Sequence, residues 1–125
     1  MPAQYSTLNH HINRYIKPND TQAWLALTFT LLYGLLTYTL VTIGLPLLGW
    51  TIHSFNIVRL FIQFHDMAHF SYFEHIQTNK IVGHIIGVFV HFPFQSWRDG
   101  HNFHHKHFGN LDKIDLSQTI VFTKK

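Results

Sequence analysis

The segment 23–52 contains no Asp, Glu, Lys or Arg, and this restricts the folds open to the chain more than any other feature. As one helix, its roughly thirty residues would extend about 45 Å, whereas the hydrocarbon core of a bilayer is about 30 Å thick. The Gly-Leu-Pro sequence at 44–46 supplies a natural break. We therefore predict one transmembrane helical hairpin, with helices near 23–43 and 47–64 joined by a very short turn.

The composition agrees with a chain that lies partly in lipid. Charged residues make up 12% of the 125 residues, about half the usual share for a soluble domain, while 46% are apolar. The absence of Cys excludes disulfides and thiolate metal sites, so a metal would be held by imidazole and carboxylate. The nine Lys and Arg are scattered, which argues against a nucleic-acid partner and suits contact with anionic lipid headgroups.

The second predicted helix is more polar than the first, because it contains His53, Asn56 and Arg59. Such residues indicate a helix with one face against other parts of the protein, and not one that faces lipid on all sides. A segment that lies in the membrane interface is the alternative. Arg59 precedes His65 by about 9 Å along a helix. Its side chain could therefore reach the membrane interface at which the first histidine motif emerges.

The distribution of basic residues predicts the orientation. Lys and Arg occur in the N-terminal arm and after the hairpin, and the turn carries none, so both ends are expected in the cytoplasm of a bacterial inner membrane or endoplasmic reticulum. No cleavable signal peptide is evident. We expect an all-α, integral membrane fold with a cytoplasmic arm (1–22), the hairpin (23–64) and a cytoplasmic and interfacial region (65–125). Within this last region, 81–95 is predicted to lie in the membrane surface and to end at Pro93.

Two histidine motifs follow the hairpin. In the first, His65 and His69 are four residues apart, which places both imidazoles on one helical face where they can share a metal. Asp66 lies off that face and could accept a hydrogen bond from the second ring nitrogen of a ligand. Taken alone, this pair is weak evidence in a chain with twelve His.

The second motif is more specific, because His101, His104 and His105 cluster on one flank of a helix. Three clustered imidazoles repel one another when protonated, and a metal that binds their neutral forms removes this cost. A surface cluster of His is the alternative, but the two motifs together favour metal binding. Nitrogen donors without thiolate suit Zn, Fe, Cu or Ni, and five His exceed what one tetrahedral zinc ion needs.

The stretch 59–123 resembles the membrane acyl-lipid fatty acid desaturases, particularly the Δ12 type. The matching pieces occur in the family's order: RLFIQFHDMAH (59–69), Asn79, Gly83, Gly87, Pro93, Trp97-Arg98, HNFHH (101–105) and GNLD (109–112).

This resemblance implies a cytoplasmic di-iron centre that activates O2 with two electrons from ferredoxin or cytochrome b5. The centre removes two hydrogens from an acyl chain of a membrane lipid and leaves a cis double bond. By the same resemblance the two Fe ions would be bound by His65, His69, His101, His104 and His105, with no catalytic residue beyond these ligands. The residues that support them would be Asp66, Trp97, Arg98, Asn110 and Asp112.

Two departures from the family pattern affect the expected activity. Met67-Ala68 replace the usual Cys-Gly of the first box and leave the ligands intact. The family's third histidine box follows a second membrane hairpin, and this sequence reaches Lys125 before either. We therefore expect the chain to be inactive alone, as a fragment or as the front half of an enzyme completed by a C-terminal partner. The alternatives are another His-box oxygenase (a hydroxylase or ketolase) and a non-catalytic membrane protein that binds metal or regulates an enzyme.

Overall fold

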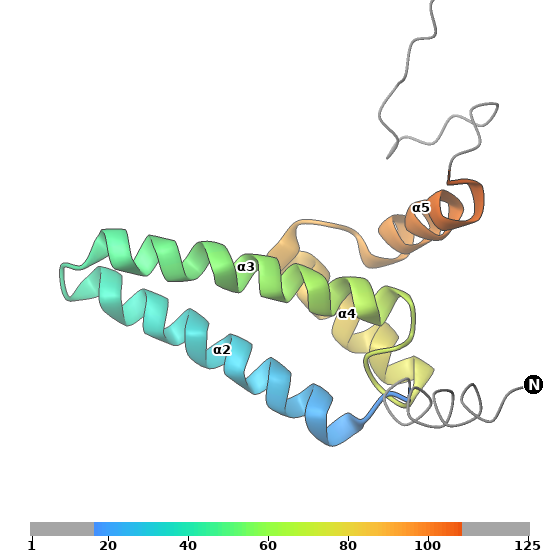
Figure 1. Ribbon diagram of the computed structural model, residues 1–125, viewed down its shortest axis with the longest axis horizontal. Helices are drawn as coiled ribbons and strands as arrows, with labels where there is room; N and C mark the ends of the chain where they lie inside the picture. Colours follow the sequence, from blue (N-terminus) through green and yellow to red (C-terminus); the bar gives the residue numbers. More distant parts are fainter. Residues whose placement is uncertain (1–16, 109–125) are drawn as a thin grey trace, which may run out of the picture.

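The computed structural model describes residues 17–108, which form four helices. These are α2 (Asp20–Thr42), α3 (Pro46–Ala68), α4 (Ile76–Val90) and α5 (Phe94–His107). The described part of the chain contains no strand, so the prediction of an all-α fold is confirmed there. Figure 1 shows α2 and α3 as a long antiparallel hairpin, with α4 and α5 beside α3 at the end away from the turn.

The hairpin begins and turns at residues suited to those positions. The side chain of Asn19 accepts a hydrogen bond from the N–H of Gln22 at 3.0 Å and so caps α2. Gly44 adopts a φ of +87° in the turn, and Pro46 occupies the first turn of α3. Both helices have 23 residues. α2 begins three residues before the predicted start at 23, and α3 continues four residues beyond the predicted end at 64, so His65 belongs to its last turn.

The buried faces of α2 and α3 carry polar side chains beside apolar ones such as Leu27. Thr30 Oγ1 lies 3.1 Å from Gln63 Oε1, and Asn56 Nδ2 donates to the carbonyl oxygen of Thr30 at 3.2 Å. The outer faces are apolar instead, with Leu31 74% and Leu47 85% exposed. This arrangement, polar inside and apolar outside, is typical of helices that pack together in lipid.

Of the helices within 17–108, α2 alone is both long and apolar enough to cross a membrane. α3 has the same length, but its polar residues, among them His53, Asn56 and Arg59, lower its hydropathy. Arg59 does not extend along α3 toward His65. Its Nε donates to Thr30 Oγ1 at 3.0 Å, and its Nη2 donates to the carbonyl oxygen of Ala26 at 3.4 Å.

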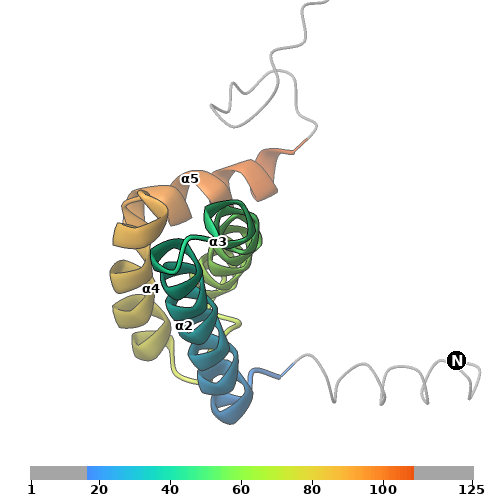
Figure 2. The same cartoon turned by 90° about the vertical axis from the view of Figure 1, so that its left-hand side faces the viewer.

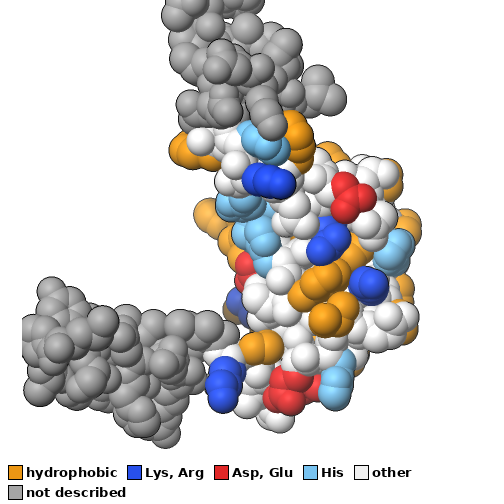
Figure 3. Space-filling model, turned by 90° about the vertical axis from the view of Figure 1, so that its right-hand side faces the viewer, with side chains coloured by type: hydrophobic (Ala, Val, Ile, Leu, Met, Phe, Trp, Pro, Cys, Tyr) orange, Lys and Arg blue, Asp and Glu red, His pale blue; other side chains and the backbone are white. Residues whose placement is uncertain are grey.

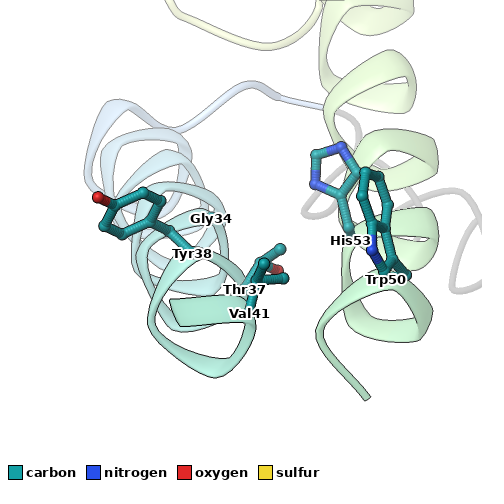
Figure 4. A pocket seen from close by; sticks show the side chains of 6 residues that line it. All are labelled: Gly34, Thr37, Tyr38, Val41, Trp50 and His53. Carbon is teal, nitrogen blue, oxygen red and sulfur yellow. The ribbon is translucent and has the colours of Figure 1, made fainter. Parts of the chain in front are cut away.

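Near the turn, the two helices enclose a pocket of about 320 Å³. Figure 4 shows Thr37 and Val41 of α2 facing Trp50 and His53 of α3 across it. Thr37 is 9% exposed, and its hydroxyl oxygen has no hydrogen-bond partner among the residues described.

Two glycines of α4 permit the close approach of α5 and of the loop that precedes it. A Cβ at Gly83 would lie 2.3 Å from Cε2 of Phe94, and one at Gly87 would lie 2.6 Å from the carbonyl oxygen of Phe92. Figure 2 looks along the hairpin and shows α4 on one side of it, with α5 crossing at the top beside α3. α4 begins before the predicted start at 81 and ends at Val90, where His91 adopts a left-handed conformation with a φ of 61°.

The loop between α3 and α4 is held by Asn79, which is fully buried. Its Oδ1 accepts the N–H of Phe73 at 3.0 Å, and its Nδ2 donates to the carbonyl oxygens of Phe73 and His75 at 2.8 and 2.9 Å. Two further contacts fix the loop to the start of α2. The N–H of Glu74 donates to Asp20 Oδ1 at 2.9 Å, and Tyr72 donates to the carbonyl oxygen of Ala23 at 3.1 Å.

Candidate metal centre

Four imidazoles converge where the end of α3 meets α5. His65 and His69 come from α3 and its C-terminal cap, and His101 and His105 come from α5. One nitrogen from each ring lies within 4.8 Å of the others. The closest pairs are His69 Nε2 to His101 Nε2 at 3.1 Å and His101 Nε2 to His105 Nε2 at 3.0 Å.

Helical spacing and the crossing of two helices produce this cluster. Each helix contributes two rings four residues apart on one face, and the crossing brings together faces that are 32 residues apart in sequence. His65 and His101 are half-buried, whereas His69 and His105 are exposed. Figure 3 shows several His side chains on the face that carries α5, together with Lys, Arg, Asp and Glu.

Two imidazoles of the cluster, those of His69 and His101, have a lowered pKa. Burial and the neighbouring rings of His65 and His105 lower the pKa of His101 to about 4. Burial, followed by the same two neighbours, also lowers the pKa of His69. A neutral imidazole has a lone pair available for a metal, so the electrostatics of the cluster favour binding.

The donor set fits one metal ion. Around a tetrahedral ion with metal–nitrogen distances of about 2.0–2.1 Å, neighbouring nitrogens lie roughly 3.3 Å apart. The Nε2 separations of 3.1 and 3.0 Å are already close to that value. Four nitrogens without thiolate suit Zn, Fe, Cu or Ni.

His104 is not part of the group of four. Its ring centroid lies 6.3 Å from that of His101 and 5.9 Å from that of His105, and its position on α5 is one residue off the face that meets α3. The structure thus brings together four of the five predicted ligands and orients the fifth separately.

Asp66 lies beside the cluster as the sequence suggested. Its Oδ1 is 3.0 Å from Nδ1 of His65. A carboxylate on Nδ1 fixes the tautomer of the ring and leaves Nε2 with a free lone pair.

Trp97 and Arg98 support the cluster from α5. The indole of Trp97 stacks on His101, with ring centroids 4.4 Å apart and an interplanar angle of 18°. Phe64, which is fully buried, lies beneath Trp97 with centroids 5.0 Å apart. Arg98 donates from Nε to the carbonyl oxygen of Ala68 at 3.0 Å, and its guanidinium carbon lies 4.2 Å from the ring centroid of Phe70.

The remaining predicted residues, Asn110 and Asp112, lie outside the residues that the structure describes. The roles of Phe64 and Phe70 do not follow from the sequence. Their only signal was the aromatic spacing around the first histidine motif, which a buried core produces equally well. The sequence marks Asn79 only as a position shared with the desaturase pattern. Its buried hydrogen bonds show why an amide is required there.

The fold and the cluster define a helical protein with a four-imidazole metal-binding geometry. Comparison with known proteins identifies its relatives. A fatty acid desaturase of Bacillus subtilis (strain 168) is 37% identical over 67 residues, which is 54% of this chain and 19% of that protein. An sn-1 oleoyl-lipid 12-desaturase of Anabaena variabilis is 35% identical over 98 residues, covering 76% of this chain and 28% of that protein. An sn-1 acyl-lipid omega-3 desaturase (ferredoxin) of Nostoc sp. (strain 36) is 30% identical over 82 residues, covering 66% of this chain and 23% of that protein.

The chain is therefore a relative of the fatty acid desaturases, which are oxidoreductases of lipid metabolism. The aligned part spans less than a third of the length of each of these proteins. No family model matches the chain. No solved structure matches it either.

Proposed function

We propose that the α2–α3 hairpin lies in a membrane, with its turn on the far side and the histidine cluster at the cytoplasmic surface. The apolar outer faces of both helices and the polar seam between them support this placement. The distribution of charge supports it too, because 21–58 has no Asp, Glu, Lys or Arg, whereas Lys, Arg, Asp and Glu side chains are spread over the face at the other end of the hairpin (Figure 3). By the positive-inside rule, this end faces the cytoplasm of a bacterial cell or of an endoplasmic reticulum.

We propose further that the cluster binds iron as part of a desaturase centre. His65, His69, His101 and His105 would hold one ion, and His104 would contribute to a second ion whose other ligands lie in further sequence. The bound iron pair supplies the activation of O2 that allows two hydrogens to be removed from an unactivated acyl chain. The observation that carries this proposal is the convergence of four imidazole nitrogens within 4.8 Å, in a chain whose relatives are named desaturases.

The residues around the cluster have definable tasks in such a centre. Asp66 holds the ring of His65 in the tautomer that presents Nε2. Trp97 restricts rotation of the His101 ring and, with Phe61 and Phe64, excludes water from its buried face. Preorganised ligands of this kind reduce the reorganisation that accompanies metal binding.

The reaction requires a substrate and an electron donor. We propose an acyl-lipid substrate and an electron donor of the ferredoxin or cytochrome b5 type, the former by analogy with the Nostoc relative, whose name includes ferredoxin. We also propose that the remaining ligands and the rest of the substrate site come from a complementing C-terminal segment. Without that segment, we expect this chain to bind metal but not to desaturate.

A non-catalytic metal-binding protein is the second candidate. It is favoured by the fact that the four imidazoles form a complete set for one ion without a further ligand. Another His-box oxygenase is a weaker alternative, because the relatives reported above are named desaturases.

The test compares membranes that contain this chain alone with membranes in which it is expressed beside a C-terminal desaturase segment carrying the third histidine box. Retention after alkaline carbonate washing checks the membrane placement, and iron content and acyl-chain composition check the chemistry. We expect a new double bond only in the combined sample, and its loss in the variant His101→Ala/His105→Ala with membrane retention unchanged. Metal bound without any new double bond in the combined sample would favour the non-catalytic candidate.

A further inference from the structure

A second site lies on the surface of the hairpin. A groove of about 690 Å³ runs along α3 beside α2. This volume falls within the range of about 300–1,000 Å³ that is usual for small-molecule sites. Most of its wall is apolar, and one strong cation, Arg59, interrupts it. The apolar lining comprises Ala26, Tyr33, Ile52, Phe55, Val58 and Ile62.

Arg59 has no anion to balance it in the described part of the chain. Its Nε and Nη2 donate to Thr30 Oγ1 and to the carbonyl oxygen of Ala26, both of which are neutral acceptors. No carboxylate of residues 17–108 lies within salt-bridge distance of it. A half-buried guanidinium in a hairpin placed in lipid is costly unless an anion approaches its remaining N–H groups.

Two other polar groups of the groove have partners, and the unpaired Oδ1 of Asn56 is buried. Asp66, at one end of the groove, accepts from the ring of His65, and the hydroxyl of Tyr72 donates to the carbonyl oxygen of Ala23. An occupant would therefore meet one available cation and an apolar wall. This combination suits an anionic amphiphile.

We propose that the groove binds an anionic phospholipid, with its phosphate on the guanidinium of Arg59 and an acyl chain along Ile52, Phe55 and Val58. The planar guanidinium donates two parallel hydrogen bonds to a phosphate, which an ammonium group cannot do. Ile52 lies about 10 Å along α3 from Arg59, on the side toward the turn, so the chain points into the bilayer while the phosphate stays nearer the surface. This proposal rests on the membrane placement proposed above, but it requires neither iron nor desaturation.

Native mass spectrometry of the detergent-purified chain tests this site with phosphatidylglycerol and with diacylglycerol of the same acyl chains. We expect one retained phosphatidylglycerol, and affinity weakened about ten- to hundredfold in Arg59→Gln, because hydrogen bonds to a charged group are lost. Arg59→Lys should be intermediate, and Lys80→Gln, which removes an α4 cation outside the groove, should bind as the wild type does. Equal retention by Arg59→Gln, or equal binding of diacylglycerol, would overturn the proposal. Equal competition by a free fatty acid would overturn the phosphate assignment in favour of a carboxylate.

A second pair of variants keeps the site testable if Arg59→Gln does not fold. Ile62→Trp leaves Arg59 in place and fills the groove, so lipid retention should fall, whereas Leu31→Trp on the outer face of α2 should leave it unchanged. Equal retention by these two variants would contradict the assigned groove. Loss of the chain from the membrane on alkaline washing would instead refute the membrane placement. Failure of the lipid site can therefore be distinguished from failure of the membrane placement.

Discussion

Arg98 Nε donates a hydrogen bond to the carbonyl oxygen of Ala68, at 3.0 Å and across 30 residues of sequence. Ala68 is the last residue of α3 and precedes the cluster residue His69, while Arg98 lies three residues before His101 on α5. The same guanidinium lies over the ring of Phe70. Arg98 therefore joins the two helices at the level of the cluster, although its guanidinium is a donor only and cannot itself be a ligand.

Replacing Arg98 should weaken metal binding without removing a ligand. We expect Arg98→Ala to lower the affinity for Co²⁺ or Zn²⁺ about 10- to 100-fold, the usual cost of losing an outer contact that orients the ligands. Arg98→Lys should recover little, because an ammonium does not reproduce the planar contact with Phe70 together with the hydrogen bond. Chelator competition measures both variants. Lys106→Ala on the same helix serves as the control, and an unchanged affinity in Arg98→Ala would show that the link does not position the ligands.

Asn79 should be essential to the stability of the α3–α4 loop. Asn79→Ala leaves the buried N–H of Phe73 without an acceptor, at a cost of about 1–3 kcal/mol for such a group. Asn79→Asp keeps that acceptor but places a buried carboxylate oxygen against the carbonyl oxygens of Phe73 and His75, so near neutral pH it should be at least as damaging as Asn79→Ala. Hydrogen exchange of the Phe73 amide, measured beside thermal unfolding in detergent, tests this order. Equal protection of that amide in the wild type and in Asn79→Ala would contradict it.

The substitution of Thr by Val should change the free energy of unfolding differently at two positions on the inner face of α2. Thr30→Val removes a hydroxyl that accepts from Arg59 and lies within hydrogen-bond distance of Gln63, so the hairpin should lose about 1–3 kcal/mol. Thr37→Val removes a buried hydroxyl oxygen without a partner among the described residues, so it should be neutral or stabilising. Unfolding midpoints in detergent compare the two. Equal destabilisation by both variants would mean that Thr37 is satisfied in solution.

The imidazole of His101 should titrate far below the usual value of about 6.5. Because burial and then His65 lower its pKa to about 4, the unfolded chain takes up a proton between about pH 4 and 6.5 that the folded chain does not. The contribution of this residue to folding is therefore fully present above pH 6.5 and is lost as the pH falls through that window. Ring NMR of the metal-free chain measures the midpoint. His65→Gln removes an ionisable neighbour that lowers the pKa of His101, so it should raise the midpoint. A midpoint near 6.5 in the wild type would refute the effect of the cluster.

The sequence predicted the helical hairpin, its turn and the two histidine motifs, because charge-free runs, Gly-Pro breaks and i, i+4 spacing are local signals. It placed the end of the second hairpin helix near 64, whereas α3 continues without a break through His65 to Ala68. It also did not separate His104 from the other four His. That distinction depends on how α5 packs against α3 and α4, and no local pattern encodes this packing.

The environment of Arg59 was also beyond sequence reasoning. Its position near His65 suggested a side chain directed to the interface, but the inner face of α2 offers the hydroxyl of Thr30 and the carbonyl of Ala26 at closer range. Contacts between helices compete with solvent for such a side chain, and only the register of α2 against α3 decides which prevails.

The four imidazoles come from two helices 32 residues apart in sequence, so an ion bound by them would act as a cross-link. A cross-link that closes a loop of this length removes chain entropy from the unfolded state worth about 4 kcal/mol, by the same reasoning that applies to a disulfide. Because the sequence has no cysteine, a bound metal would supply the kind of cross-link that a disulfide supplies in other proteins. Chelation would loosen α4 and α5 from the hairpin, and the order of this half of the protein would depend on the supply of metal.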